Sequence, residues 1–203
     1  MTGELIIDKP ADYTSFDVVA VCRRLCHERK IGHTGTLDPM ATGVLPLLLG
    51  KATRAVSLLE DTDKTYEAGF RLGLATDTED VTGKVLETNE SPVSRAVLEK
   101  VLPQFRGEIM QVPPMYSAVS KDGKRLYELA RKGLEVEREA RPVTIFQLEL
   151  TEYDETAREG KLTVSCSKGT YIRTLIADLA KAAGSLGVMT SLRRTRACGF
   201  TLE

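Results

Sequence analysis

A stretch rich in glycine and proline, residues 32–46, restricts the possible fold more than any other feature of this chain. It reads GHTGTLDPMATGVLP, and so many glycines and prolines predict a loop rather than a helix or a strand. Asp38 lies in the middle, where Pro39 biases its backbone toward an extended conformation. Two interpretations remain open: Asp38 caps backbone N–H groups of a turn, or it is a nucleophile or general base in a concave site.

Composition is that of an ordinary globular protein. The 203 residues are 42% hydrophobic and 28% charged, which suits one large domain or two small ones. The net charge of −1 gives no global support for nucleic-acid binding, so a polyanion site would need local basic patches. No apolar run approaches the roughly 20 residues of a membrane span, and no signal peptide is evident. We therefore expect no membrane association and a cytoplasmic location.

The cysteines and histidines form no recognisable metal motif. Four cysteines include no CxxC pair, and the chain has only two histidines, so we expect reduced structural thiols and no zinc site. The acidic residues 77–80 lack the spacing of an EF-hand, and turn capping is the preferred interpretation. Neither a metal nor a cofactor is expected.

Local patterns predict an α+β fold, because strands are mixed with unevenly spaced helices rather than alternating regularly with them. Thr14 and Asp17 match a capping box that begins a helix, which is expected to end near residue 30. A second helix is predicted at about 54–59, and a third begins at Ser94 or at Ser91 with Pro92. A last helix follows residues 167–173 and runs to about residue 183. Strands are predicted at residues 4–8, 64–72, 84–87, 143–150 and 161–166.

Few polar side chains could act together in one site. Besides Asp38, the candidates are Tyr66 in a predicted strand, and Tyr171 and Arg173 in the first turn of the last predicted helix. An arginine there opposes the helix dipole, as expected when a residue serves a site rather than helix stability. The chain has neither a nucleophile elbow nor a GxxxxGK[ST] phosphate loop. A carboxylate, an arginine and aromatic rings fit covalent chemistry on a flat heterocycle without a cofactor.

Two basic segments lie in the second half of the chain. Residues 121–132 mix lysines and arginines with Tyr127 and leucines, and residues 192–196 form a second basic cluster. For the first segment two interpretations remain open. It is either a solvent-exposed short helix or a surface that contacts the backbone and bases of a nucleic acid.

Five separated segments of the chain resemble the TruB family of tRNA pseudouridine synthases. In order they are DKP with Ser15, GHTGTLDPMATGVLPLLLGKATR, KTYEAGFRLGLATDTEDVTG, PPMYSAVSKDGKRLYELARKG and SCSKGTYIRTLIADLA. The resemblance implies the pseudouridine synthase fold, which has a mixed, mainly antiparallel sheet, flanking helices and a central RNA-binding cleft. It implies an isomerase that converts the uridine of the T-arm loop, position 55 of tRNA, to pseudouridine.

The resemblance also implies roles for individual residues. Asp38 matches the nucleophilic carboxylate of the family, and Arg173 matches the arginine that pairs with it at roughly 2.7–2.9 Å. Tyr171 matches a pocket tyrosine that assists proton removal at carbon 5, and Tyr66 matches the ring that stacks on the target uracil. The remaining matches, to positions around the substrate, are His33 near the flipped nucleotide, Lys9 holding a loop or a phosphate, Leu192 in an apolar wall and Asp80.

The implied reaction needs a flipped base and an RNA-gripping surface. Flipping costs a few kcal/mol, and stacking on Tyr66 would offset about 1–3 kcal/mol of that cost. Residues 114–141 correspond to the mobile RNA-gripping insert of the family, whose basic residues supply positive charge locally. We expect one catalytic domain over residues 1–203, without the family's C-terminal PUA-like domain. Asp12 departs from the family pattern, which usually has glycine there.

The expected partner is the T-arm stem-loop of tRNA, and the chain is expected to act as a monomer without a protein partner. Two other functions are considered. A non-catalytic RNA-binding or RNA-folding module with the same fold would bind RNA without isomerising it. A metal-dependent hydrolase using His33 and Asp38 lacks a complete set of ligands.

Overall fold

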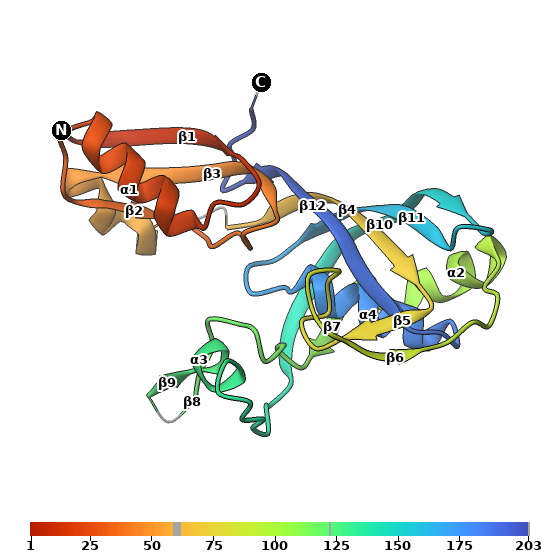
Figure 1. The fold of residues 1–203 in the computed structure, drawn as a ribbon. Coiled ribbons are helices and arrows are strands. Elements are labelled where there is room, and N and C mark those ends of the chain that lie inside the picture. The colour runs from red at the N-terminus through yellow and green to blue at the C-terminus, as the bar shows by residue number, and fades with distance from the viewer. Residues whose placement is uncertain (59–61, 122, 203) are drawn as a thin grey trace. The chain divides into compact units, whose positions relative to one another are not determined.

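The computed structural model describes residues 1–58, 62–121 and 123–202, which form two compact units (Figure 1). Unit 1 comprises Met1–Glu67, Ser165–Lys168 and Ser191–Glu203, and unit 2 comprises Ala68–Val164 and Gly169–Thr190. Each unit therefore combines segments from distant parts of the sequence.

The strands account for much of the described chain. They are β1 (Gly3–Lys9), β2 (Ile31–His33), β3 (Thr42–Leu49), β4 (Lys64–Leu72), β5 (Leu74–Thr76), β6 (Val85–Thr88), β7 (Gly107–Gln111), β8 (Ser120–Lys121), β9 (Lys124–Arg125), β10 (Arg141–Asp154), β11 (Glu159–Cys166) and β12 (Gly187–Ala197). The α-helices are α1 (Ser15–Leu25), α2 (Arg95–Val101), α3 (Leu126–Ala130) and α4 (Ile172–Ala182), and the 3₁₀ helices are η1 (Gly50–Leu58) and η2 (Leu102–Phe105). The helix predicted at 54–59 is thus the end of η1, and residue 59 lies outside the described residues.

Within the described residues the main sheet has eight strands. Seven follow the order β1-β3-β12-β4-β11-β10-β7, and β2 also pairs with β3. β1 and β2 both run antiparallel to β3, whereas β12 pairs with β3 in parallel, so the sheet is mixed. The short pairs β5-β6 and β8-β9 are antiparallel. Helices mixed with such a sheet confirm the predicted α+β class.

β3 is the buried centre of unit 1, and α1 packs beside β2 (Figure 1). The predicted capping box is present: the Thr14 hydroxyl accepts from Asp17 N at 3.0 Å, and Asp17 Oδ2 accepts from Thr14 N at 2.8 Å. α1 ends at Leu25, before the predicted end near residue 30. His27 has a left-handed φ of 48°, so the chain turns there and leads into β2.

The glycine- and proline-rich stretch contains less loop than predicted. Residues 32–33 belong to β2 and residues 42–46 belong to β3, which leaves residues 34–41, here named the Asp38 loop, without regular structure. The prediction of a loop over all of residues 32–46 was therefore wrong at both ends. Strand pairing with β1 and β12 gives this backbone hydrogen-bond partners that composition does not reveal.

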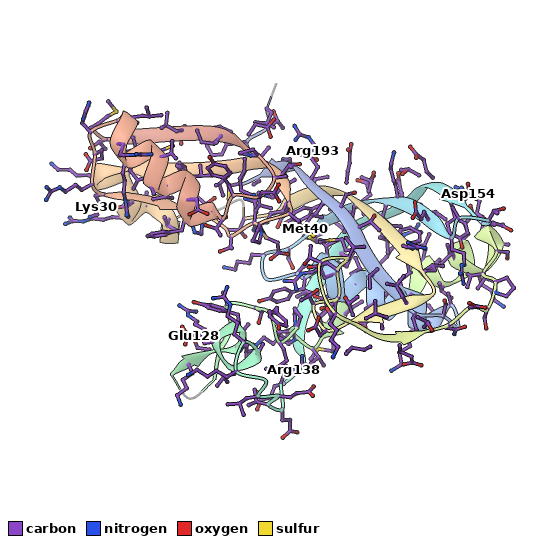
Figure 2. The ribbon with its side chains drawn as sticks, viewed as in Figure 1. Lys30, Met40, Glu128, Arg138, Asp154 and Arg193 are labelled. Carbon is purple, nitrogen blue, oxygen red and sulfur yellow. The ribbon has the colours of Figure 1, made fainter. Side chains whose placement is uncertain are left out.

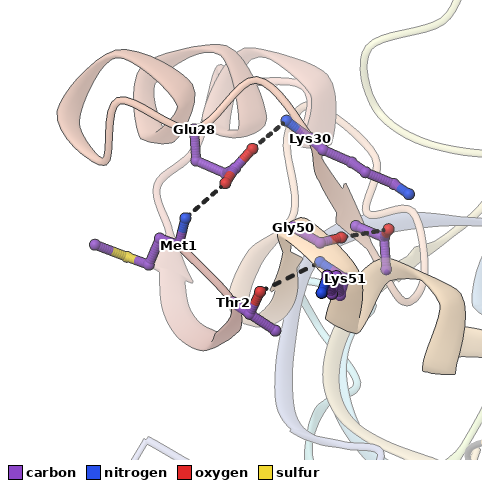
Figure 3. Close-up of polar contacts among 7 residues, drawn as sticks. Met1, Thr2, Glu28, Lys30, Gly50 and Lys51 are labelled. Carbon is purple, nitrogen blue, oxygen red and sulfur yellow. Dashed lines mark hydrogen bonds and ion pairs between the residues drawn. The ribbon is translucent and has the colours of Figure 1, made fainter.

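The N-terminus is held against the turn that follows α1 (Figure 3). The Met1 ammonium group contacts Glu28 Oε2 at 2.8 Å, and Glu28 Oε1 accepts from Lys30 N at 3.0 Å. Lys51 N donates to the Thr2 hydroxyl at 3.4 Å. These contacts join the start of β1 to the turn after α1 and to the start of η1.

Unit 2 contains α4, which packs against α2 and η2. Of the two predicted starts, α2 uses the Ser94 cap, and α4 ends before Gly184, which has a φ of 77°. Residues 114–141 contain β8, β9 and α3, which are gathered together in Figure 1 and in which Figure 2 marks Glu128 and Arg138. Residue 122 of this insert lies outside the described residues.

Candidate functional site

The residues singled out from the sequence belong to both units. Those of unit 1 are Lys9, His33, Asp38, Tyr66 and Leu192. Those of unit 2 are Asp80, Tyr171 and Arg173. Asp38 and Arg173 belong to different units, and their pairing stays a prediction.

Lys9, the last residue of β1, is completely buried. Its ammonium group donates to the carbonyl oxygens of Pro10 at 2.9 Å, Tyr13 at 2.6 Å and Pro39 at 3.1 Å. An ammonium group has three protons, so these carbonyls use its full donor capacity. Burial lowers the pKa of Lys9, and the negative charge of Asp38 opposes that effect. Of the two roles expected for Lys9, the contacts favour holding a loop over binding a phosphate.

The backbone on each side of Asp38 is anchored. Leu37 N donates to the buried hydroxyl of Ser15 at 2.8 Å, and that hydroxyl donates to Leu37 O at 3.3 Å. On the other side, Pro39 O accepts from Asp12 N at 2.9 Å as well as from the buried lysine ammonium group. Asp12 has a left-handed φ of 65°, which fits a position where the family usually has glycine. The half-buried Asp38 is thus carried by a loop with fixed neighbours on both sides.

Arg194, in β12, lies against the same loop and is completely buried. Its Nε donates to Val44 O at 2.8 Å, its Nη2 to Gly35 O at 3.1 Å and its Nη1 to Thr36 O at 3.5 Å.

From the sequence, Arg194 was predicted only to be part of a basic cluster. Strand alternation is the signal that could have found it, because buried Leu192 and Arg194 alternate with the more exposed Ser191 and Arg193. Arg193, labelled in Figure 2, pairs instead with Asp8 at 3.0 Å.

Tyr66 and His33 are both influenced by Arg194. Tyr66 is buried in β4, and burial raises its pKa to about 12, although the charge of Arg194 and a hydrogen bond between the two side chains oppose the rise. The phenol is therefore un-ionised near neutral pH. Burial lowers the pKa of His33, and the nearby Arg194 charge lowers it further. Within the described part of the chain, His33 Nδ1 has no hydrogen-bond partner.

In unit 2, Tyr171 is the N-terminal cap of α4 and is fixed by Gln111. Gln111 Oε1 accepts from Tyr171 N at 3.0 Å, and Gln111 Nε2 donates to Tyr171 O at 3.1 Å. The glutamine side chain is buried and mimics the pairing of a neighbouring strand. This glutamine was not among the predicted site residues, because nothing local indicates its contact 60 residues away.

Arg173 and Asp80 are buried in unit 2. Arg173 Nη1 donates to Thr78 O at 2.8 Å and its Nη2 donates to Tyr116 O at 2.9 Å, which joins α4 to the acidic turn and to the insert. Asp80 Oδ1 accepts from the Thr78 hydroxyl at 2.9 Å, from Thr82 N at 2.9 Å and from the Thr82 hydroxyl at 2.5 Å. These bonds support turn capping for Asp80.

Neighbouring Glu79 contacts the same helix. The Thr174 hydroxyl donates to Glu79 Oε2 at 2.6 Å. Burial raises the pKa of Glu79, while this hydrogen bond and the charge of Arg173 oppose the rise.

No group of three or more histidine, cysteine or acidic residues within residues 1–58, 62–121 and 123–202 could hold a metal ion. Across those residues, too, every helix is too short or too polar to cross a membrane.

Known proteins with similar sequences match nearly the whole length of this chain. The chain is 52% identical over 193 residues to tRNA pseudouridine synthase B of Azoarcus sp., covering 95% of this chain and 64% of the relative. It is 51% identical over 203 residues to tRNA pseudouridine synthase B of Pseudomonas fluorescens, covering 100% and 66%. The chain thus spans about two thirds of the length of these curated relatives.

A solved structure, the crystal structure of a Cbf5-Nop10-Gar1 complex, matches with a TM-score of 0.76 and 33% identity over 99% of this chain and 50% of that one. The fold is therefore that of the pseudouridine synthases. The model of the TruB family pseudouridylate synthase N-terminal domain matches residues 23–172. Because this match covers most of the chain, the protein belongs to the TruB family of pseudouridylate synthases.

Proposed function

We propose that this chain is the catalytic part of a tRNA pseudouridine synthase, which isomerises the uridine at position 55 in the T-arm loop. The observation that carries the proposal is the anchoring of the Asp38 loop by buried groups on both sides of one carboxylate. A fixed carboxylate suits a nucleophile. Relatives named tRNA pseudouridine synthase B at 51–52% identity support the same reaction.

The proposed reaction is an isomerisation, so its atoms balance without a co-reactant. The bond from uracil nitrogen 1 to the ribose breaks with Asp38 as nucleophile, and the base rotates while it remains bound. A bond from carbon 5 to the ribose then forms, and the proton displaced from carbon 5 is replaced by one on nitrogen 1. Arg173 pairs with Asp38, Tyr171 assists removal of the proton, and Tyr66 stacks on the flipped base.

RNA binding is proposed to involve both units. His33 contacts the flipped nucleotide, Leu192 supplies an apolar wall, and Lys9 acts by holding the loop. One catalytic domain over residues 1–203, acting as a monomer in the cytoplasm, completes the proposal. In the insert at 114–141, four exposed basic residues on or beside β9 and α3 could contact phosphates of the T-arm: Lys124, Arg125, Arg131 and Lys132.

Asp38→Asn tests the proposal. We expect it to abolish pseudouridine formation in an unmodified tRNA transcript, measured by mass spectrometry, while RNA still binds. Asp12→Asn is a matched control, because it removes one carboxylate from the same unit and asparagine tolerates a left-handed φ. Turnover by Asp38→Asn would contradict the assignment. If the unaltered chain binds RNA without isomerising it, the alternative of an RNA-binding or RNA-folding module is correct.

A further inference from the structure

We propose that Arg194 is a positioning residue that holds the Asp38 loop and the Tyr66 ring in one arrangement. Its effect on catalysis rests on the proposed synthase function. Its effect on the loop is a property of unit 1 and can be measured without any reaction.

The hydrogen bonds of Arg194 bracket Asp38 in the sequence. Two acceptors, Gly35 O and Thr36 O, precede Asp38, and the third, Val44 O, follows it. Each nitrogen of the guanidinium group therefore meets a different carbonyl. Because the group is planar and has a fixed fork of donors, it sets the spacing between the carbonyls that it joins. Complete burial removes competition from water for these bonds.

The backbone position of Arg194 is also fixed. β12 pairs with β3 in parallel, with Arg194 opposite Gly43. Gly43 has a φ of +103°, and a Cβ added there would lie 2.2 Å from Arg194 O. The two backbones therefore approach more closely than any residue with a side chain would allow. The arginine leaves β12 directly beside the strand that follows the loop.

The same guanidinium group reaches β4. Its charge acts on Tyr66 and opposes the rise that burial gives the Tyr66 pKa, so one charged group influences both the phenol and the loop. Gly35 makes room for this arrangement, because a Cβ there would lie 3.2 Å from Lys64 Cε and 3.6 Å from Arg194 Nη1. The three elements β4, β12 and the Asp38 loop thus meet at Arg194.

A positioning role and a merely structural role predict different results. A structural arginine would lower stability when replaced, but folded molecules would keep their turnover. A misplacement of about 1 Å at a reacting group can cost roughly 100-fold in rate. Lysine keeps the charge of arginine but lacks the planar fork, so Arg194→Lys separates charge from geometry.

The experiment compares Arg194→Lys with Arg193→Lys, a matched change at a more exposed position of the same strand. Hydrogen exchange is followed in residues 34–46 and, as a reference in unit 2, in residues 143–150. We expect Arg194→Lys to speed exchange roughly tenfold in residues 34–46 only, as the loss of about one net hydrogen bond would. On a T-arm stem-loop we expect kcat to fall about 10- to 100-fold and KM to stay within about twofold.

Unchanged exchange in Arg194→Lys overturns the proposal, as does a wild-type kcat in a folded variant of an active chain. If the unaltered chain is inactive, the proposed synthase function fails while the exchange result still decides the role of Arg194. Should Arg194→Lys not fold, Tyr66→Phe gives the test, because it removes only the Tyr66 hydroxyl on which the charge of Arg194 acts. Faster exchange in residues 34–46 of that variant is expected, and no change refutes the coupling of ring and loop.

Discussion

At the scale of single residues, two buried cations hold the Asp38 loop in place. Lys9 and Arg194 are both completely buried, and backbone carbonyls accept their hydrogen bonds. Burying a charge costs free energy unless its hydrogen bonds are replaced, so each cation is stable only while those carbonyls stay in place. The Asp38 loop supplies several of them. The position of Asp38 is therefore coupled to two completely buried charges of unit 1.

Lys9→Met tests this coupling. The substitution keeps an unbranched side chain but removes the ammonium donor from three carbonyls, of which Pro39 O keeps Asp12 N as a second donor. We expect the free energy of unfolding to fall by about 2–4 kcal/mol. Urea denaturation measures the change. Lys51→Met, at an exposed lysine of the same unit, should alter the free energy of unfolding by less than about 0.5 kcal/mol. Equal effects of the two substitutions would contradict a role for the buried ammonium group.

Glu79 gives a pH dependence whose sign can be worked out. Its pKa is raised by burial above the ordinary value of 4.5, so the folded state binds its proton more tightly than the unfolded state. The stability that this carboxyl contributes is present below pH 4.5 and is lost as pH rises through the raised pKa. Glutamine does not titrate and can still accept from Thr174.

We therefore expect Glu79→Gln to gain stability relative to the wild type as the pH rises from about 4 to about 8. Urea denaturation at both values measures the difference in the free energy of unfolding. Glu149→Gln, at an exposed glutamate, controls for the change in net charge. A relative stability that falls with pH in Glu79→Gln would mean that the sign is wrong.

At the scale of elements, the close pairing of β3 with β12 shapes unit 1. Parallel pairing at Thr42–Arg193 and Gly43–Arg194 joins the strand after the Asp38 loop to a strand 150 residues later. Gly43 allows this approach because it has no side chain and adopts a positive φ. The strand that follows the Asp38 loop is thus located by long-range pairing.

Gly43→Ala should therefore be strongly destabilising. The added Cβ would clash with the Arg194 backbone at 2.2 Å, and its φ of +103° strains any other residue, so we expect a loss of about 2–4 kcal/mol. Gly32→Ala is the matched control, because nothing lies within 4 Å of a Cβ there. Thermal unfolding of both variants measures the effect. A similar unfolding temperature for the two would argue against the close approach.

At the scale of the whole molecule, charge is unevenly distributed. The net charge is −1, yet residues 114–141 carry seven basic and five acidic residues. Four of the basic side chains are exposed on or beside β9 and α3. RNA affinity depends on local phosphate contacts, so a chain without net positive charge can still bind RNA through such a patch.

Replacing these four residues by glutamine should weaken T-arm binding and reduce the slope of log K against log salt by up to about 3. Filter binding at several salt concentrations measures the slope. The control replaces four exposed lysines elsewhere in unit 2, namely Lys84, Lys100, Lys161 and Lys181. If the control lowers the slope equally, the insert has no special part in binding.

Local sequence patterns correctly predicted those helices and strands whose ends are set by contacts between residues close together in the sequence. The capping box of Thr14 and Asp17, the cap at Ser94 and the strand at residues 64–72 all appear in the structure. The end of α1 and the two ends of the loop around Asp38 were predicted wrongly. Those boundaries depend on pairing with β1, β3 and β12, which local composition does not encode.

The sequence by itself determined the family resemblance and the residue types available for the proposed chemistry, because residue types and their order carry that information. It did not distinguish buried cations from exposed ones. Arg193 and Arg194 are neighbours, yet one pairs with Asp8 near the surface and the other is buried against the Asp38 loop. Only the tertiary structure decided this, since burial and hydrogen-bond partners depend on segments about 150 residues apart in the chain.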